Sequence, residues 1–268
     1  MKFTGERMVP ASADATTLWE HVYRYQFATK FVVGKEVLDI ACGEGYGAAA
    51  LRRAGARRIV GVDISKEACE HAAEKYGLDA RVGDGQSIPL DSASVDVIVS
   101  FETIEHVAEP GLFLEECRRI LRPGGRLIIS TPNREATCVY SPNNPFHVRE
   151  FSVPEFKKAV EDRFSVRAYF CQRVFKAAWW NPYGLSAISW PTRRLRGLGR
   201  FAVCVRALSC PHLGDRGTRH ARENPVGVIA DQNFFTPNWF DPFVIRKPGS
   251  AWGEVPLFIV AVAARRPD

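Results

Sequence analysis

Two groups of acidic and imidazole side chains in this chain are of types that could do chemistry. Glu102, Glu105 and His106 form the first group, and His147 with Glu150 forms the second. Histidine and carboxylate side chains can remove a proton from a hydroxyl. Carboxylates and imidazoles together also suit Mg²⁺, Mn²⁺ or another borderline ion, which could lower the pKa of a bound hydroxyl.

These groups leave two chemical interpretations open. In the first, one metal ion is held by four side chains, namely Glu102, Glu105, His106 and His147. In the second no metal is used, His106 or His147 is the catalytic base, and Glu102 orients a ligand. Each histidine also has a structural interpretation, because His106 could cap or pack a helix and His147 could pin the loop before Phe151.

A second candidate site is the segment from Val37 to Gly47, with the sequence VLDIACGEGYG. It runs from an apolar strand into a glycine-rich turn, where the lack of a Cβ lets a ligand approach the backbone. Dinucleotide sites usually have the spacing GxGxxG, whereas Gly43, Gly45 and Gly47 give GxGxG. Asp39, inside the strand, would suit a ligand that bears an ammonium group.

Two more carboxylates follow at the ends of the next apolar runs. Asp63 lies twenty residues past Gly43, where it could accept both hydroxyls of a ribose. Asp84 is placed to accept from an adenine amine, and the adjoining Ile64 and Gly85 complete the expected set. Singly, Asp39 or Asp84 could be a turn or cap carboxylate. In this order, the three acids fit one adenosine-containing ligand.

The elements that must position these residues alternate between short apolar runs and amphipathic segments, which predicts repeated βα units and a parallel sheet. Helices are expected to begin near Glu44, Lys66 and Glu109, the last ending at Arg122-Pro-Gly-Gly, with another over Val153–Val160. The predicted strands are Val37–Ala41, Ile59–Asp63, Ala80–Gly83, Val95–Ser100, Arg126–Thr131, Phe164–Cys171 and Leu257–Ala264. The candidate residues follow strands, so they should meet at the carboxyl edge of the sheet.

Taken together, these motifs resemble the class I S-adenosylmethionine-dependent methyltransferases over roughly residues 35 to 171. The resemblance rests on Asp39-x-x-x-Gly43-x-Gly45, Asp63, Asp84, Ser100-Phe-Glu-Thr-Ile-Glu-His-Val107 and Leu121-Arg-Pro-Gly-Gly. It implies S-adenosylmethionine as cofactor and a Rossmann-like, doubly wound α/β fold with a seven-stranded, mostly parallel sheet. Tyr23, Arg24 and Tyr25 could reach the methionine end of the cofactor.

The expected organisation is a helical cap over 1–35, a cofactor-binding core over 36–171, a lid over 172–250 that sets specificity, and a closing strand within 251–268. The flanks, among them Phe3-Thr-Gly-Glu-Arg and Asn144-Pro-Phe-His-Val-Arg-Glu-Phe151, resemble methyltransferases of glycan and glycosylated natural-product pathways. That resemblance implies O-methylation of a sugar hydroxyl, with a small molecule or a glycan as substrate.

Two alternatives come from the segment Glu102-x-x-Glu-His106. It resembles metal sites of small-RNA 3′-terminal 2′-O-methyltransferases and of ubiquinone-pathway O-methyltransferases. An RNA substrate is disfavoured by the modest net charge of +6 and by the lack of an RNA-binding module. A scaffold that binds cofactor without catalysis is disfavoured by the intact acids and glycines.

Composition sets the remaining expectations. The start of the chain has no apolar core of the signal-peptide type, and no apolar stretch approaches roughly 20 residues, so we expect a cytoplasmic protein. The seven cysteines lack CxxC pairs and are expected to be small buried residues. The segment Arg193–Leu208 could be a basic amphipathic helix that touches a membrane surface, but it is more simply interpreted as part of the lid.

Overall fold

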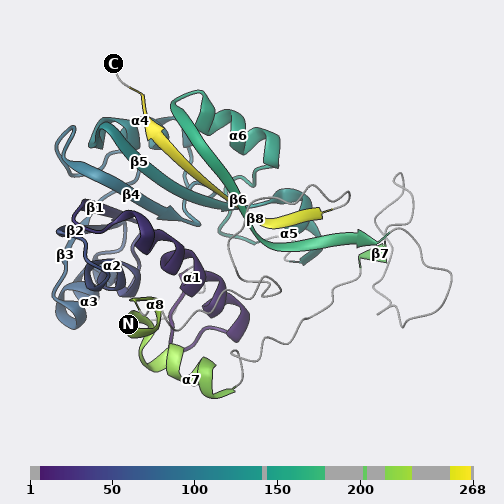
Figure 1. Cartoon of the computed structure of the whole chain (residues 1–268), viewed down its shortest axis with the longest axis horizontal. Helices are drawn as coiled ribbons and strands as arrows, with labels where there is room; N and C mark the ends of the chain where they lie inside the picture. The colour runs from purple at the N-terminus through teal and green to yellow at the C-terminus, as the bar shows by residue number, and fades with distance from the viewer. Residues whose placement is uncertain (1–6, 141–143, 179–201, 204–214, 231–253, 267–268) are drawn as a thin grey trace.

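A mixed β-sheet forms the centre of the computed structural model of this chain (Figure 1). The structure describes residues 7–140, 144–178, 202–203, 215–230 and 254–266. The strand order is β3-β2-β1-β4-β5-β8-β6-β7. The strands are β1 (Glu36–Ile40), β2 (Arg58–Asp63), β3 (Asp79–Val82), β4 (Val95–Phe101), β5 (Leu121–Pro132), β6 (Phe164–Ala178), β7 (Ala202–Val203) and β8 (Glu254–Arg265).

The first five strands are parallel to one another, whereas β8 is antiparallel to both β5 and β6. β7 is a two-residue strand that pairs only with the end of β6. The other seven strands make a mostly parallel sheet, as predicted. All seven predicted strands are present, within a few residues at most ends.

Both faces of the sheet are buried along its central strands, which explains the continuous apolar runs of those strands. In β1, Val37 belongs to one core cluster while Leu38 and Ile40 belong to the other, because successive side chains point to opposite faces. Helices cover the two faces, so the sheet is doubly wound. The first face carries α1 (Ala15–Ala28), α2 (Tyr46–Arg53), α3 (Lys66–Tyr76) and α8 (Pro225–Ala230), and the second carries α4 (Pro110–Ile120) and α6 (Val153–Glu161).

Several element boundaries differ from the prediction. The helix expected near Glu44 begins at Tyr46, because Gly43 and Gly45 have positive φ angles that a helix cannot contain. α4 ends at Ile120, directly before Arg122-Pro-Gly-Gly as predicted, but that segment belongs to the start of β5, which therefore begins earlier than Arg126, and its pairing with β4 shifts register there. α5 (Arg134–Tyr140) was not predicted.

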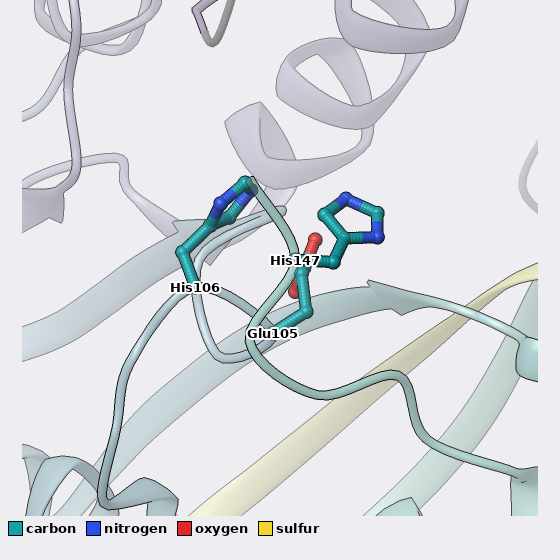
Figure 2. A group of neighbouring side chains, drawn as sticks. All are labelled: Glu105, His106 and His147. Atoms are coloured by element: carbon teal, nitrogen blue, oxygen red, sulfur yellow. The ribbon is translucent and has the colours of Figure 1, made fainter. Parts of the chain in front are cut away.

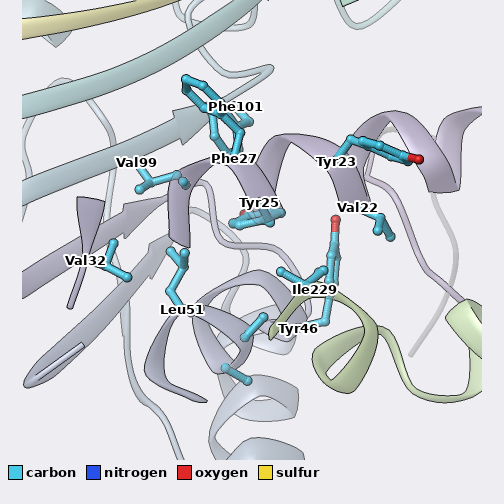
Figure 3. Packing of buried hydrophobic residues seen from close by; sticks show 14 of the residues in the cluster. Val22, Tyr23, Tyr25, Phe27, Val32, Tyr46, Leu51, Val99, Phe101 and Ile229 are labelled. Carbon is cyan, nitrogen blue, oxygen red and sulfur yellow. The ribbon is translucent and has the colours of Figure 1, made fainter. Parts of the chain in front are cut away.

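The region predicted as a lid begins with sheet structure, since β6 continues past Cys171 to Ala178. The same region also contains two described helices, α7 (Asp215–Glu223) and α8. Both pack on the N-terminal helix α1, and α8 also contacts α2 (Figure 3). Trp19 on α1 donates from Nε1 to the hydroxyl of Thr218 on α7, at 3.2 Å.

The predicted basic helix over Arg193–Leu208 lies outside the described residues, except for Ala202–Val203, which form strand β7. Over the described ranges, the helices fall short of the length and apolar character needed to cross a membrane.

Candidate cofactor and acceptor site

The turn after β1 is built on backbone conformations that favour glycine. Gly43 and Gly45 have φ angles of 54° and 84°. A Cβ on Gly45 would lie 2.5 Å from the Cβ of Ala72 and 2.9 Å from Cδ1 of Leu78, so α3 packs directly on this glycine. A Cβ on Gly43 would meet nothing within 4 Å. The turn is therefore packed at Gly45 and open at Gly43, where a ligand could approach the backbone.

Asp63, the last residue of β2, holds two backbone segments together. Its Oδ2 accepts from the amide of Gly43 at 2.8 Å, and its Oδ1 accepts from the amide of Ser65 at 2.9 Å. Each carboxylate oxygen has two acceptor positions, so both oxygens can still accept a ribose hydroxyl. The predicted ribose carboxylate thus lies beside the glycine turn.

Asp39 lies in β1 and is completely buried. The hydroxyl of Tyr25 on α1 donates to its two oxygens, at 3.2 Å and 3.1 Å. Burial raises the pKa of Asp39 to about 8, although the bond from Tyr25 opposes the shift. The ring of Tyr25 fills the space that a Cβ on Gly47 would need. The third glycine of the motif therefore serves the packing of α1 against α2.

The residues expected around the adenine lie at the same carboxyl edge of the sheet. Ile64 follows β2 and is 74% exposed, so it offers an apolar surface. Asp84 is exposed, and its Oδ1 accepts from the amide of Gln86 at 2.9 Å, which closes a turn. A Cβ on Gly85 would lie 3.0 Å from the ring of Phe113, so this glycine permits close packing.

The acids after β4 differ in their surroundings. Glu102 has a φ angle of 53°, and its Oε1 accepts from the hydroxyl of Ser130 at 2.8 Å. Glu105 is completely buried, and its Oε2 accepts from the hydroxyl of Thr131 at 2.9 Å. Burial raises the pKa of Glu105 well above its usual range, and the nearby charge of Glu102 raises it further. Among the described residues, Oε1 of Glu105 has no hydrogen-bond partner.

The two histidines lie against each other, with ring centroids 5.0 Å apart (Figure 2). Nδ1 of His106 is 2.9 Å from the carbonyl of Phe146, which can only accept, so Nδ1 carries a proton and, in the neutral ring, Nε2 has the lone pair. His147 makes two contacts. Its Nδ1 is 2.8 Å from Oε1 of Glu150, and its Nε2 is 3.0 Å from the side-chain nitrogen Nδ2 of Asn144. Both nitrogens of His147 are therefore engaged.

The structure brings together three of the four predicted metal ligands. One donor atom from each of Glu105, His106 and His147 lies within 4.8 Å of the others (Figure 2). Glu102 is not in that group, because its carboxylate is bonded to Ser130. A carboxylate oxygen and two imidazole nitrogens at this spacing are suitable donors for a divalent ion.

Sequence reasoning named Tyr25 for the methionine end of the cofactor but did not predict its hydrogen bond to Asp39, and it missed the other residues that orient the site. The contact between Tyr25 and Asp39, and the bonds from Ser130 and Thr131 to the acids after β4, depend on elements distant in the chain. A tyrosine in an apolar helix carried no signal that its hydroxyl reaches a strand. Thr137, whose hydroxyl donates to Glu150 at 2.6 Å, lies on the unpredicted helix α5.

Residues 38–129 match the protein family described as "Methyltransferase domain". Over 168 residues the chain is 39% identical to a probable S-adenosylmethionine-dependent methyltransferase from Mycolicibacterium smegmatis, covering 60% of this chain and 64% of that relative. Over 102 residues it is 42% identical to a ubiquinone biosynthesis O-methyltransferase from Parvibaculum lavamentivorans, covering 36% of this chain and 40% of that one. The chain thus spans less than two thirds of the length of these relatives.

Solved structures with low sequence identity share the fold. A putative methyltransferase from Haloferax volcanii, solved in complex with a methyltransferase activator, gives a TM-score of 0.55 at 19% identity, covering 93% of this chain and 90% of that one. An S-adenosylmethionine-dependent methyltransferase from Thermotoga maritima gives 0.52 at 19% identity, covering 93% and 92%. The chain therefore matches a methyltransferase domain over residues 38–129, and its sheet and helices form the class I methyltransferase fold.

Proposed function

We propose that this chain is an S-adenosylmethionine-dependent O-methyltransferase that acts on a hydroxyl group of a small molecule or a glycan. The observation that carries the proposal is that two sets of residues lie at the same carboxyl edge of the sheet. This edge presents the open glycine turn with Asp39 and Asp63 on one side and a proton-accepting histidine, His106, on the other. The match to the methyltransferase family and the names of the relatives support it.

The residues at the turn fit the cofactor chemically. Asp39 is a buried carboxylate suited to the α-ammonium, Asp63 has acceptor positions for the ribose, and exposed Ile64 offers a surface for the adenine. The open space at Gly43 allows the nucleoside to approach the backbone. When bound, S-adenosylmethionine supplies an electrophilic methyl group on a sulfonium.

The chain's own residues would remove the acceptor's proton and orient the acceptor. A hydroxyl must lose its proton as it attacks the methyl carbon, and Nε2 of His106 has the lone pair that can take it. His147 is held by Glu150, so it is better suited to fixing the acceptor's position than to accepting a proton. Glu102, fixed by Ser130, would orient the acceptor or the cofactor.

A divalent metal is a further part of the proposal, because Glu105, His106 and His147 fit one. Glu105, whose Oε1 has no hydrogen-bond partner among the described residues, and one nitrogen from each histidine would hold Mg²⁺ or Mn²⁺, with His147 exchanging its contact to Asn144 for the ion. The ion would lower the pKa of the acceptor hydroxyl. We expect turnover to be lost in EDTA and restored by added metal. Full activity in chelator would instead leave His106 as the sole base.

The acceptor that we propose first is a sugar hydroxyl, on the resemblance of the flanks to glycan methyltransferases. A phenol or quinol is the second candidate, because the chain matches ubiquinone biosynthesis O-methyltransferases at about 40% identity over their shared region. A methyl-transfer screen with labelled cofactor over sugars, glycosylated metabolites, dihydroxybenzoates and RNA separates these classes. Label transfer to RNA alone would overturn both.

Isothermal titration with S-adenosylhomocysteine tests the shared basis of these proposals. We expect wild-type protein to bind it and Asp63→Ala to bind at least about tenfold more weakly, since charge-assisted hydrogen bonds to the ribose are lost. Asp79→Ala is the matched control, because Asp79 is a salt-bridged carboxylate at the opposite end of the neighbouring strand. Wild-type affinity in a folded Asp63→Ala variant would refute the ribose role, and no binding to wild type would refute the proposed function.

A further inference from the structure

A groove lies on the first face of the sheet, at the end of β5 that is remote from the acids and histidines of the candidate site. Its volume is about 380 Å³, which is within the range of about 300 to 1,000 Å³ for small-molecule pockets. Arg126, which lines it, comes six residues before Pro132 at the carboxyl end of β5. At the rise of a strand, that is about 20 Å from the expected acceptor.

Aromatic rings and small side chains line this groove. Phe31, at the end of the 3-10 helix Thr29–Phe31, and Phe170 on β6 are both half-buried there. Each ring packs against Phe27 of α1, with ring centroids 5.4 Å and 4.9 Å apart. Val262 and Ala264 on β8 add smaller apolar side chains. Because the aromatic rings are held by their packing on α1, the apolar part of the groove is preformed.

A β-bulge brings an arginine of β6 into the same groove. In the pairing of β6 with β8, Ala168 lies opposite Val262 and Val166 lies opposite the next residue of β8, so Arg167 is an extra residue. Val166 packs on the core cluster of the second face, whereas Arg167 and Ala168 both line the groove on the first face. Bulges redirect side chains in this way. The bulge therefore adds the charge of Arg167 to that of Arg126.

The charges of these two arginines are not neutralised by the chain. Over the described ranges, neither Arg126 nor Arg167 makes an ion pair, and no acidic side chain lines the groove. By contrast, Arg122 at the same end of β5 is paired with both Glu36 and Asp96. The guanidinium carbon of Arg126 lies 5.9 Å from the centre of the Phe31 ring. The groove thus presents two positive charges beside apolar surface.

These features favour a ligand that has an apolar part and an anionic part. A guanidinium group matches the oxygens of a carboxylate or a phosphate, and it also stacks on flat rings. A ligand ring that packs against a phenylalanine removes apolar surface from water. An inorganic anion would not cover the exposed parts of Phe31 and Phe170, and an uncharged ring would leave both arginines without a counter-charge.

We propose that this groove binds a small aromatic acid. The ring of the ligand lies against Phe31 and Phe170, and its carboxylate or phosphate is held by Arg126 and Arg167. This inference goes beyond the proposed methyl transfer and does not depend on it, because the groove shares no residue with the candidate cofactor and acceptor site.

The test locates binding on the full-length protein by NMR. Protein with ¹³C-labelled alanine and valine methyl groups, with S-adenosylhomocysteine added to occupy the cofactor site, is titrated with 2-naphthoate, 2-naphthyl phosphate and neutral 2-naphthamide. We expect at least one acid to shift the methyl signals of Val262 and Ala264 saturably. Val148, which follows His147 at the acceptor site, should not move. The amide should bind at least about tenfold more weakly than that acid, because it lacks the charge-assisted hydrogen bonds. The tighter of the two acids identifies the anionic group.

Arg126→Met and Arg167→Met each remove one guanidinium from an exposed position, so neither should lower Tm. Each should weaken the acid at least about tenfold, since a hydrogen bond between charged groups is lost. Arg81→Met is the matched control, because it removes the same charge from β3, where Arg81 is paired with Asp79. It should keep the wild-type affinity.

Four results would overturn the inference. In the first, neither acid shifts the signals of Val262 and Ala264, and in the second the amide binds as tightly as the acids. In the third, both arginine variants of the groove keep the wild-type affinity. In the fourth, Arg81→Met weakens binding as much as they do, which would show attraction by net charge alone. Failure of the protein to bind S-adenosylhomocysteine would refute the proposed function but would leave this test of the groove in force.

Discussion

Carboxylates at the carboxyl edge of the sheet take different roles because their surroundings differ. Asp63 accepts from two backbone amides and so shapes the turn. Asp39 is buried under the side chain of Tyr25 and accepts a hydrogen bond from its hydroxyl. Asp84 closes its own turn and is exposed. Residue type alone cannot rank these three acids, whereas burial and hydrogen bonding can.

The raised pKa of Asp39 predicts how stability depends on pH. Its pKa is about 8 in the folded chain, against an ordinary value of 3.8, so the folded state keeps a proton that the unfolded state releases between these values. The stabilisation is therefore fully present below about pH 3.8 and is lost as the pH rises through about 8. We expect the Tm of cofactor-free protein to fall from about pH 6.5 to about pH 8 and then to level off, and Asp39→Asn to flatten this fall.

The control for that measurement is Asp79→Asn, which changes an exposed, salt-bridged carboxylate. It should leave the slope of Tm against pH unchanged. An Asp39→Asn variant with the wild-type slope would contradict the assignment. If the cofactor's ammonium pairs with ionised Asp39, binding near pH 7 also releases a proton, which calorimetry in buffers of different ionisation enthalpy detects.

At the level of elements, the turn between β1 and α2 is fixed from both sides. α3 packs on Gly45 and Tyr25 of α1 packs on Gly47, so two helices from different parts of the chain define one loop. The short loop leaves Gly43 as its open position. The conformation of the glycine turn thus depends on the docking of α1 and α3 as much as on its own sequence.

Gly45→Ala should be more destabilising than the same change at Gly34. Both glycines have positive φ, 84° and 69°, so alanine costs about 1 to 2 kcal/mol of backbone strain at each. Only at Gly45 does the new methyl group also meet Ala72 and Leu78, while at Gly34 it meets nothing within 4 Å. Urea unfolding of both variants measures the difference, and equal losses of stability would contradict the packing argument.

The sequence was sufficient to predict the strands, because their apolar runs are long and lie between glycine and charged segments. It also placed Asp39, Asp63 and Glu102 at one edge, since each follows or lies in a parallel strand. It could not predict the partners of these residues. The hydroxyls of Tyr25 and Ser130 reach the site only through tertiary packing, which leaves no local pattern.

At the scale of the whole molecule, contacts of the helices α7 and α8 join the N-terminal helix α1 to the second half of the chain. Trp19 on α1 donates to Thr218, and Nη2 of Arg222 donates to the carbonyl of Ala13 at 2.9 Å. Val228 and Ile229 on α8 are buried in the same cluster as α1 and α2 (Figure 3). Residues from the second half of the chain therefore pack against α1, the helix that carries Tyr25 and Arg24, and stabilise its position.

Ile229→Ala tests that arrangement. Deleting the buried side chain should cost about 2 to 5 kcal/mol of unfolding free energy, and each kcal/mol lowers Tm by about 2 to 4 °C in a chain of this size. Leu112→Ala is the control, because Leu112 is 55% exposed on α4 and its truncation should cost little. Differential scanning calorimetry compares them, and a Tm for Ile229→Ala as high as that of the control would show that α8 contributes little to the core.

The antiparallel strand β8 has a consequence for how the protein is made. It lies between β5 and β6, which have no direct pairing with each other, and it is synthesised last of the three. On the ribosome, β6 emerges well before the strand that joins it to the growing sheet, so its unpaired edge is exposed during translation. We expect chaperones to bind the nascent chain at this exposed edge of β6. That binding should end only once Glu254–Arg265 have left the exit tunnel and β8 can pair with β6.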